Sequence, residues 1–334
     1  MNLKSKITKL HYSERKSLLY LLLWFPSLIY RLITDIRNYL YDKNILKSET
    51  VNANVVAVGN LTTGGVGKTP LVAEIAKYYL AKNEITAVIS RGYGGKLSSK
   101  SVNVISDGNK IFYDAKMSGD EPYWYAKNIS GLIVITCSSR VKAAKYAIEK
   151  FGVKNIILDD AFQHRKINRD LNILVIDSEK RFGNEHVLPL GPLRENISAL
   201  KRADKIVVMS KGSKNYSDTV NFANEMNAQI CDAAPAEVYN IKTGTKLADS
   251  VSVTAMCAIG QPEQFFNFLT PRFNVVNKII FDDHHMYSES DVKNIDMPII
   301  TTEKDAVKLK DFGFSNIYAL KLRLSINCKD LLND

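Results

Sequence analysis

The chain has 334 residues, of which 46% are hydrophobic and 24% charged, without repeats or low-complexity tracts. This composition excludes a disordered or fibrous protein, and the length indicates two domains that can each bury a core. Lysine and arginine exceed aspartate and glutamate by ten, which favours an anionic partner, although a generally basic proteome produces the same surplus. The four cysteines lack metal-ligand spacing and indicate a reducing, cytosolic compartment.

An apolar segment without charges, residues 18–30, lies near the N-terminus between lysines and arginines. A bilayer-spanning helix takes about twenty residues, so this segment is too short to cross a membrane, and Pro26 interrupts it. No small-residue cleavage site follows, as a secretory signal requires. Two interpretations remain, a buried helix and a helix in the membrane interface. The flanking cations favour the second, so we expect residues 1–48 to attach to an anionic membrane surface.

A glycine-rich stretch, residues 59–72 (GNLTTGGVGKTPLV), follows an apolar run and precedes apolar residues at helical spacing. Strand, glycine-rich turn and helix is the context of a phosphate-binding loop, or P-loop, although a plain connecting turn has the same outline. Thr62 stands where the usual spacing has the first glycine, but the end of the motif fits. The expected nucleotide-binding residues are Asn60, Thr62, Thr63, Gly64, Gly65, Val66, Gly67, Lys68 and Thr69.

Five further apolar runs are continuous rather than alternating, and helix-length segments separate several of them. They lie at 86–89, 132–136, 155–158, 172–176 and 206–209. This pattern predicts an α/β fold, a doubly wound P-loop domain at 49–235 whose mainly parallel sheet is covered on both faces. Its ligand site is expected at the carboxyl ends of the strands.

The pattern restarts past residue 235 with a second, smaller α/β domain at 236–334. Strands are expected at 251–258, 275–281 and 298–301, and helices at 263–269 and 304–309. The cleft between the two domains is the expected active site.

Acidic pairs stand at two expected strand or helix ends. Asp159 and Asp160 end an apolar strand, the position from which an aspartate holds Mg²⁺ in P-loop enzymes, although a turn also accommodates such a pair. Thr69 is the third expected metal ligand. Asp120 and Glu121 precede a proline, where a carboxylate also caps a helix.

Other polar residues follow the strands or lie in long loops. Arg91 lies in SRGYGG after the second strand, and Gln163 and His164 follow Asp160 by about one helical turn. Arg194 lies in a loop rich in glycine and proline, at 181–195, and ordered loops of that length are usually functional. We expect these residues and Glu121 to contact substrate or phosphate.

The segment FDDHHMY, at 281–287, places Asp283 beside His284. Two histidines with two aspartates are one pattern of zinc ligands, but no other cluster supplies a third ligand at suitable spacing. A histidine polarised by a carboxylate suits acid–base chemistry better. In TTEKDAVKL, at 301–309, Glu303 stands where a GTPase has its base-reading lysine, so a GTPase is not predicted.

Together these stretches resemble the tetraacyldisaccharide 4′-kinase family, the lipid A 4′-kinases of Gram-negative bacteria. The resemblance runs from about residue 50 to 310 through VGNLTTGGVGKTPLV, SRGYGG, GDEP, DDAFQHRKINRDLNILVID, FGNEHVLPLGPLRE, DHH and TEKDAVKL. The family's loop also has threonine at the position of Thr62. Departures are DDAFQH in place of DDGLQH, and Asp282 and Met286 where proline is common, which affects loop shape.

The resemblance implies transfer of the γ-phosphate of ATP to the 4′-hydroxyl of an acylated glucosamine disaccharide 1-phosphate lipid, giving the lipid A precursor lipid IVA. It assigns Asp120 as the base and His284, with Asp283 before it, as the assisting pair. Because these residues lie in different domains, closure of the cleft is expected to assemble the site. ATP and Mg²⁺ are the expected cofactors. The protein is expected at the cytoplasmic face of the inner membrane, as a monomer without a nucleic-acid partner.

Two other classes share parts of this pattern. A membrane-bound partition or switch ATPase has the same GGxGKT core, but it usually carries a second lysine just before the loop glycines, where this chain has Thr62 and Thr63. A lipid-binding adaptor with a vestigial loop would have lost nucleotide binding.

Overall fold

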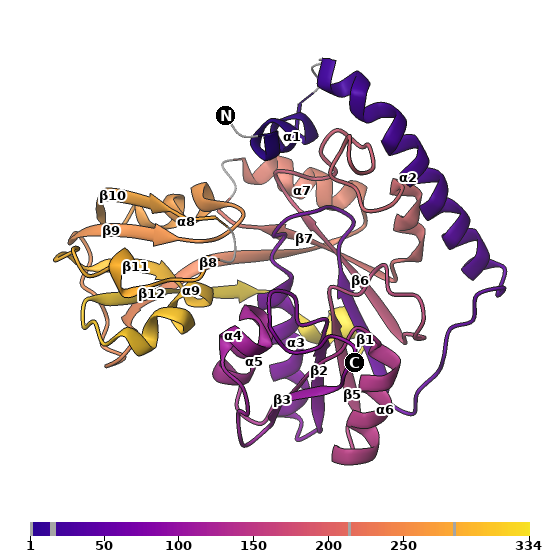
Figure 1. The fold of residues 1–334 in the computed structure, drawn as a ribbon, viewed down its shortest axis with the longest axis horizontal. Coiled ribbons are helices and arrows are strands. Elements are labelled where there is room, and N and C mark those ends of the chain that lie inside the picture. The colour runs from indigo at the N-terminus through magenta and orange to yellow at the C-terminus, as the bar shows by residue number, and fades with distance from the viewer. Residues whose placement is uncertain (1–2, 14–17, 213–214, 283–284) are drawn as a thin grey trace.

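The protein is described from a computed structural model, which covers residues 3–13, 18–212, 215–282 and 285–334. Within these residues twelve strands form one sheet, in the order β10-β9-β11-β12-β8-β7-β6-β1-β5-β2-β4-β3. Helices and loops gather around the two ends of this sheet as a larger and a smaller lobe (Figure 1).

The larger lobe contains a parallel sheet with one antiparallel strand, β3, at its edge. Its strands are β1 (Asn54–Gly59), β2 (Thr86–Ser90), β3 (Asn103–Asp107), β4 (Ile133–Thr136), β5 (Asn155–Asp159), β6 (Leu171–Asp177) and β7 (Lys205–Ser210). Strands β2, β4, β5 and β6 are buried along their whole length, as their continuous apolar sequences predict.

Helices cover both faces of this sheet. In β1, Val56 and Val58 pack with helices α3 (Lys68–Ala81) and α5 (Asp120–Asn128), whereas Val55 and Ala57 pack with α6 (Arg140–Phe151). Helix α7 (Tyr216–Glu225) packs on the sheet beside β6 and β7. Shorter helices are α4 (Ala115–Ser118) and the 3₁₀ turn η1 (Ile197–Arg202). The expected doubly wound P-loop α/β fold is confirmed.

The smaller lobe extends the same sheet instead of forming a separate one. It contains β9 (Ser252–Cys257), β10 (Asn274–Ile280), β11 (Ile299–Thr302), β12 (Ile317–Ser325), α8 (Pro262–Leu269), α9 (Glu303–Leu309) and the 3₁₀ turns η2 (Glu289–Asp291) and η3 (Lys310–Phe312). The strands and helices expected beyond residue 250 are present close to the expected bounds, and β12 adds a strand that the sequence did not predict.

Strand β8 (Gln229–Asn240) connects the two lobes, because it pairs with β7 in parallel and with β12 antiparallel. It passes through residue 235, where the sequence placed a domain boundary. Helix α10 (Cys328–Leu332) then returns the C-terminus to the larger lobe, where Leu331 joins the core beneath α3. The division at 49–235 and 236–334 stays a prediction.

The N-terminal region forms α1 (Leu3–His11) and α2 (Leu18–Asp42), a long helix along one side of the larger lobe (Figure 1). The expectation that Pro26 interrupts the apolar segment is wrong, since α2 is a continuous helix of 25 residues that includes Pro26. By length and apolar composition α2 is sufficient to cross a membrane, contrary to the sequence expectation. The apolar pattern resumes after Arg31, beyond the expected segment at 18–30.

Helix α2 is nevertheless docked on the larger lobe along its length. Tyr20 hydroxyl and His186 Nε2 lie 3.2 Å apart, Ser27 donates to the Val187 carbonyl at 2.8 Å, and Asn38 donates to Glu195 at 2.8 Å. These contacts on both sides of Pro26 support the helix where the proline removes a backbone hydrogen bond.

Candidate active site

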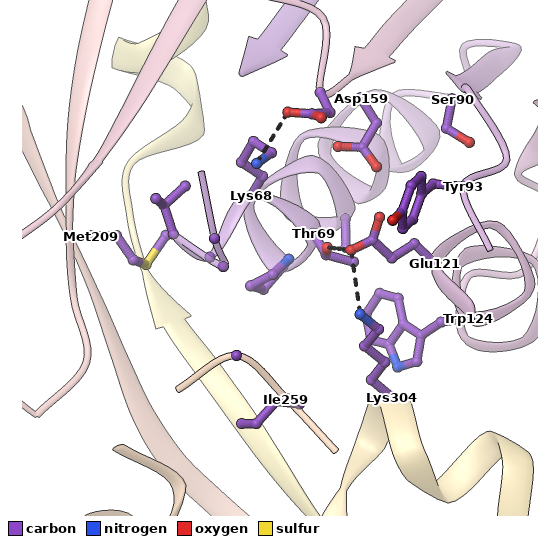
Figure 2. Close-up of a pocket in the computed structure, with 18 of the residues that line it drawn as sticks. Lys68, Thr69, Ser90, Tyr93, Glu121, Trp124, Asp159, Met209, Ile259 and Lys304 are labelled. Atoms are coloured by element: carbon purple, nitrogen blue, oxygen red, sulfur yellow. Dashed lines mark hydrogen bonds and ion pairs between the residues drawn. The ribbon is translucent and has the colours of Figure 1, made fainter. Parts of the chain in front are cut away.

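The P-loop connects β1 to α3 at the carboxyl edge of the sheet. Its last residues, Lys68 and Thr69, lie near Asp159 and Glu121 (Figure 2). Gly67 precedes α3 in the left-handed region, with φ of 93°, and a Cβ there would come within 2.9 Å of the Met209 side chain. Asn60 is fully buried and donates to the Thr62 carbonyl at 2.7 Å, while its Oδ1 accepts from Lys68 Nζ at 2.9 Å. Asn60 therefore fixes both the turn and the direction of the lysine.

Two cations of the larger lobe converge on Asp160. Arg194 Nη1 donates to both carboxylate oxygens at 2.9 Å, and Lys68 Nζ lies 3.2 Å from Oδ1. Loss of solvation in the cleft would raise the pKa of Asp160, but Lys68 and Arg194 outweigh it and lower the pKa to about 2. The two cations expected to contact phosphate are therefore held in place by a carboxylate.

Asp159 has the opposite environment. It is buried at the end of β5 and accepts a hydrogen bond from the Tyr125 hydroxyl at 3.1 Å. Burial, assisted by the negative charge of Glu121, raises the pKa of Asp159 to about 7. A bound cation would favour its ionised form.

The oxygen atoms at this edge suit Mg²⁺. Among the described residues no group of three or more His, Cys, Asp or Glu side chains forms a metal site. Magnesium in kinases is held by one or two carboxylates together with substrate phosphates, so a complete protein cage is not required. The Thr69 hydroxyl and the two adjacent aspartates Asp159 and Asp160 fit that set.

Helix α5 begins with two acidic residues that reach toward the smaller lobe. Its N-cap Gly119 has φ of 93°, and a Cβ there would come within 2.6 Å of the Tyr93 carbonyl. Asp120 is nearly buried, and its Oδ2 lies 2.7 Å from Lys308 Nζ of α9. Glu121 accepts from the Thr69 hydroxyl at 3.3 Å and lies 3.7 Å from Lys304 Nζ (Figure 2).

Asp283 and His284 lie outside the described residues, so their expected approach to Asp120 stays a prediction. The next residue, His285, stacks on Phe281 with ring centroids 4.3 Å apart, and its Nε2 lies 3.3 Å from an Asp291 oxygen. The carbonyl of His285 accepts from Lys308 at 3.1 Å.

A cleft of about 1420 Å³ connects these groups. The expected site residues that line it are Thr63, Gly64, Gly65, Val66, Gly67, Lys68, Thr69, Arg91, Glu121, Asp159, Asp160, Gln163, His164 and Arg194. Asn60 and Thr62 are buried, and Asp120 is enclosed at the junction between α5 and α9. Tyr30, Thr34 and Arg37 of α2 also line the cleft, which therefore extends from the P-loop to the N-terminal helix.

Gln163 and His164, about one helical turn after Asp160, have different surroundings. Gln163 donates to the Asn60 carbonyl at 2.9 Å and to Glu195 at 3.1 Å. It therefore supports the P-loop through the backbone of Asn60. His164 is partly buried among cations, and burial together with Arg140 lowers its pKa to about 4. It is a neutral imidazole near neutral pH.

Sequence reasoning missed several residues at the cleft. Lys211 and Gln261 donate to the Gly65 carbonyl at 2.9 and 3.0 Å, from the larger and the smaller lobe respectively. Lys304 and Lys308 contact the acidic pair of α5. Lys211 directly follows β7, so its position at a strand end was a signal available in the sequence.

Comparison with known proteins gives a consistent result. The family model described as "LpxK: Tetraacyldisaccharide-1-P 4'-kinase" matches residues 19–334. A tetraacyldisaccharide 4′-kinase of Desulfotalea psychrophila is 35% identical, covering 94% of this chain and 95% of that protein. One of Halothermothrix orenii is 36% identical, covering 90% and 87%. A crystal structure of LpxK from Aquifex aeolicus in complex with ATP is 30% identical with a TM-score of 0.77, covering 94% and 97%.

Proposed function

The chain belongs to the tetraacyldisaccharide 4′-kinase family, and we propose that it transfers the γ-phosphoryl group of ATP to the 4′-hydroxyl of a tetraacylated glucosamine disaccharide 1-phosphate. The product is the 4′-phosphorylated lipid A precursor. The observation that carries this proposal is the single cleft that joins a P-loop to an apolar helix, since a lipid kinase must bring a polyphosphate and a membrane lipid together.

The nucleotide would bind along the P-loop. The backbone amides of residues 64–69, around the start of α3, suit phosphate oxygens. Lys68 and Arg194, which both contact Asp160 here, would bind the outer phosphates in its place. Arg91, Gln163 and His164 line the wall beside them. The ATP complex of the Aquifex relative supports this choice of nucleotide.

Thr69, Asp159 and Asp160 would hold Mg²⁺. When bound, the ion would neutralise charge on the phosphates during transfer. Glu121, which accepts from the Thr69 hydroxyl, would orient that hydroxyl in the same network.

Asp120 would act as the base that takes the proton of the 4′-hydroxyl, with His284 and Asp283 assisting from the smaller lobe. A carboxylate beside an ammonium group is favoured in its ionised form, and Asp120 lies against Lys308. Asp120 is enclosed while the lobes are together, which supports a site that forms on closure and excludes water.

Attachment to the membrane would occur through α2. Eleven large apolar side chains of this helix are 46–75% exposed: Leu18, Leu21, Leu22, Trp24, Phe25, Leu28, Ile29, Leu32, Ile33, Ile36 and Tyr39. The opposite side is hydrogen-bonded to the larger lobe along the helix, which favours a helix that lies in the interface over one that crosses. The protein would therefore sit at the cytoplasmic face of the inner membrane, as a monomer without a nucleic-acid partner.

An assay with labelled ATP and the disaccharide lipid tests this function. The purified full-length protein is incubated with both, and the lipid and free phosphate fractions are counted. A kinase labels the lipid. A switch ATPase would release only free phosphate, and an adaptor would produce neither, so either result would contradict the proposal.

A further inference from the structure

The TEKDAVKL segment contains two lysines on one face of α9, because Lys304 and Lys308 are four residues apart. They meet the two carboxylates that begin α5: Lys308 pairs with Asp120, and Lys304 lies near Glu121. Thus a motif without a predicted chemical role forms a two-point contact between the lobes.

The two contacts differ in strength. The Lys304 and Glu121 side chains are 24% and 38% exposed and 3.7 Å apart, a distance at which an exposed ion pair contributes little. The Lys308 and Asp120 side chains are only 5% and 8% exposed and 2.7 Å apart. Removal of one member of a buried pair is costly because the other charge is left without compensation.

Helix α9 is fixed to its own lobe. Thr302 donates to Asp305 Oδ2 at 2.8 Å and accepts from the Asp305 backbone amide at 3.1 Å, which caps the helix. Asp305 is fully buried, and its Oδ2 also accepts from the Ala258 amide at the end of β9, at 3.0 Å. The lysines therefore move with the smaller lobe when it moves.

Lys308 also contacts a second part of the site. Its Nζ donates to the His285 carbonyl at 3.1 Å and lies 6.0 Å from the ring centre of Tyr287. His285 directly follows His284, the residue expected to assist Asp120. One ammonium group thus connects the Asp120 carboxylate of the larger lobe to the His285 carbonyl of the smaller lobe.

We propose that Lys308 is a positioning residue that holds Asp120 and the segment around His285 in register when the lobes are together. This inference rests on the proposed function, in which Asp120 takes the proton of the lipid hydroxyl. Lys308 touches neither nucleotide nor lipid in this proposal and acts through Asp120.

The test compares Lys308→Met with Lys310→Met in the full-length protein. Lys310 is exposed and follows α9, so its variant controls for loss of one lysine. For Lys308→Met we expect kcat to fall on the order of a hundredfold, the cost of a misplaced reacting group. The ATP dissociation constant stays within about threefold because the P-loop is untouched.

The pH profile separates positioning from general damage. Loss of the cation moves the acid limb of the kcat profile to higher pH, because a carboxylate without a neighbouring ammonium ionises less readily. Among the described residues, the other charged or titratable groups facing the pair are Glu121, Lys304, Asp305, His285 and Tyr287. These groups, and the expected assisting residues Asp283 and His284, are the same in both variants. A purely structural defect lowers kcat at every pH without moving the limb.

Lys308→Gln provides the same test if Lys308→Met does not fold, since glutamine retains a donor for the carboxylate and the carbonyl. We expect a smaller loss of kcat but the same movement of the acid limb. A kcat within about threefold of the wild type with an unmoved limb in either variant overturns the proposal.

Asp120→Asn distinguishes this proposal from the proposed function. If Asp120→Asn retains full activity, the assignment of the base fails. If it is inactive while Lys308→Met is fully active, only the role of Lys308 fails. If Lys308 acts through Asp120, adding Lys308→Met to Asp120→Asn causes no further loss of the residual kcat.

Discussion

The two sides of the cleft are held together in different ways. On the nucleotide side, Lys68, Arg194, Asp160 and Asn60 bind one another, and all belong to the larger lobe. On the acceptor side, Asp120 finds its partner Lys308 in the other lobe. The charged contacts of the expected nucleotide site therefore lie within one lobe, to which the smaller lobe adds the Gln261 hydrogen bond to Gly65, whereas the charged contact of the expected acceptor site joins the two lobes. ATP binding and phosphoryl transfer should then respond to different substitutions.

Asp120→Asn gives the largest expected effect. Removal of a general base costs about 10² to 10⁴ in rate, so kcat should fall by that factor while the ATP dissociation constant changes little. Single-turnover transfer from labelled ATP to the lipid and equilibrium ATP binding measure the two quantities. Asp296→Asn, at an exposed loop position, serves as the control. Unchanged transfer in Asp120→Asn would remove this residue from the reaction.

Lys68→Met should weaken ATP binding, the step that Asp120→Asn leaves nearly unchanged. A hydrogen bond to a charged group contributes about 1.5–3 kcal/mol, so the ATP dissociation constant should rise about tenfold to a hundredfold. Lys127→Met, at an exposed position on α5, is the matched control. Titration with a fluorescent ATP analogue measures both variants. If Lys68→Met binds ATP as tightly as the control, the nucleotide side is misassigned.

Helix α2 belongs to the acceptor side, since it would deliver the lipid. Changing Leu21, Phe25 and Leu32 to glutamine removes exposed apolar area, and each such side chain contributes up to about 1.5–3 kcal/mol when fully buried. Partial insertion predicts at least about a tenfold loss of partitioning into anionic vesicles, with ATP binding unchanged. Ile45→Gln controls for an exposed apolar residue outside the helix. Equal vesicle sedimentation of all proteins would contradict attachment through α2.

The nucleotide side and the acceptor side also differ in how far the sequence predicts them. Strand, glycine turn and helix are local features, so Lys68, Asp159 and Asp160 could be placed at one edge of the sheet from their neighbours alone. Lys308 and Asp120 are far apart in the chain, and nothing near either residue indicates the other. The spacing of Lys304 and Lys308 shows only that both lie on one face of a helix.

Three strands escaped prediction, β3, β8 and β12, and the last two share a physical character. Strand β12 alternates exposed and partly buried residues over its later half, and β8 contains Pro235 and has buried residues interrupted by partly buried or exposed ones. Neither shows the continuous apolar run of a strand buried on both faces. Each is stabilised by pairing with the other across a long stretch of chain, which a single sequence does not reveal. The apolar face of α2 continues beyond Pro26 and Arg31, although a proline and a charge at these positions predicted a shorter apolar segment.

Substitution of His164 should have the smallest effect, a change in the pH dependence of the free energy of unfolding. It tests whether the surroundings of His164 on the nucleotide side are formed in the absence of nucleotide. Burial and nearby Arg140 lower its pKa from 6.5 to about 4 in the folded protein. Above pH 6.5 the imidazole is neutral in both states and pH does not alter its contribution. As the pH falls from 6.5 to 4, the unfolded chain takes up a proton that the folded protein does not, so the free energy of unfolding decreases. His164→Asn should flatten this decrease, with a constant difference from the wild type between about pH 7 and 8. Urea unfolding across pH 4 to 8 measures it. Parallel curves for the two proteins throughout that range would show that folding does not lower the pKa of His164, and that the cations do not enclose it in the absence of nucleotide.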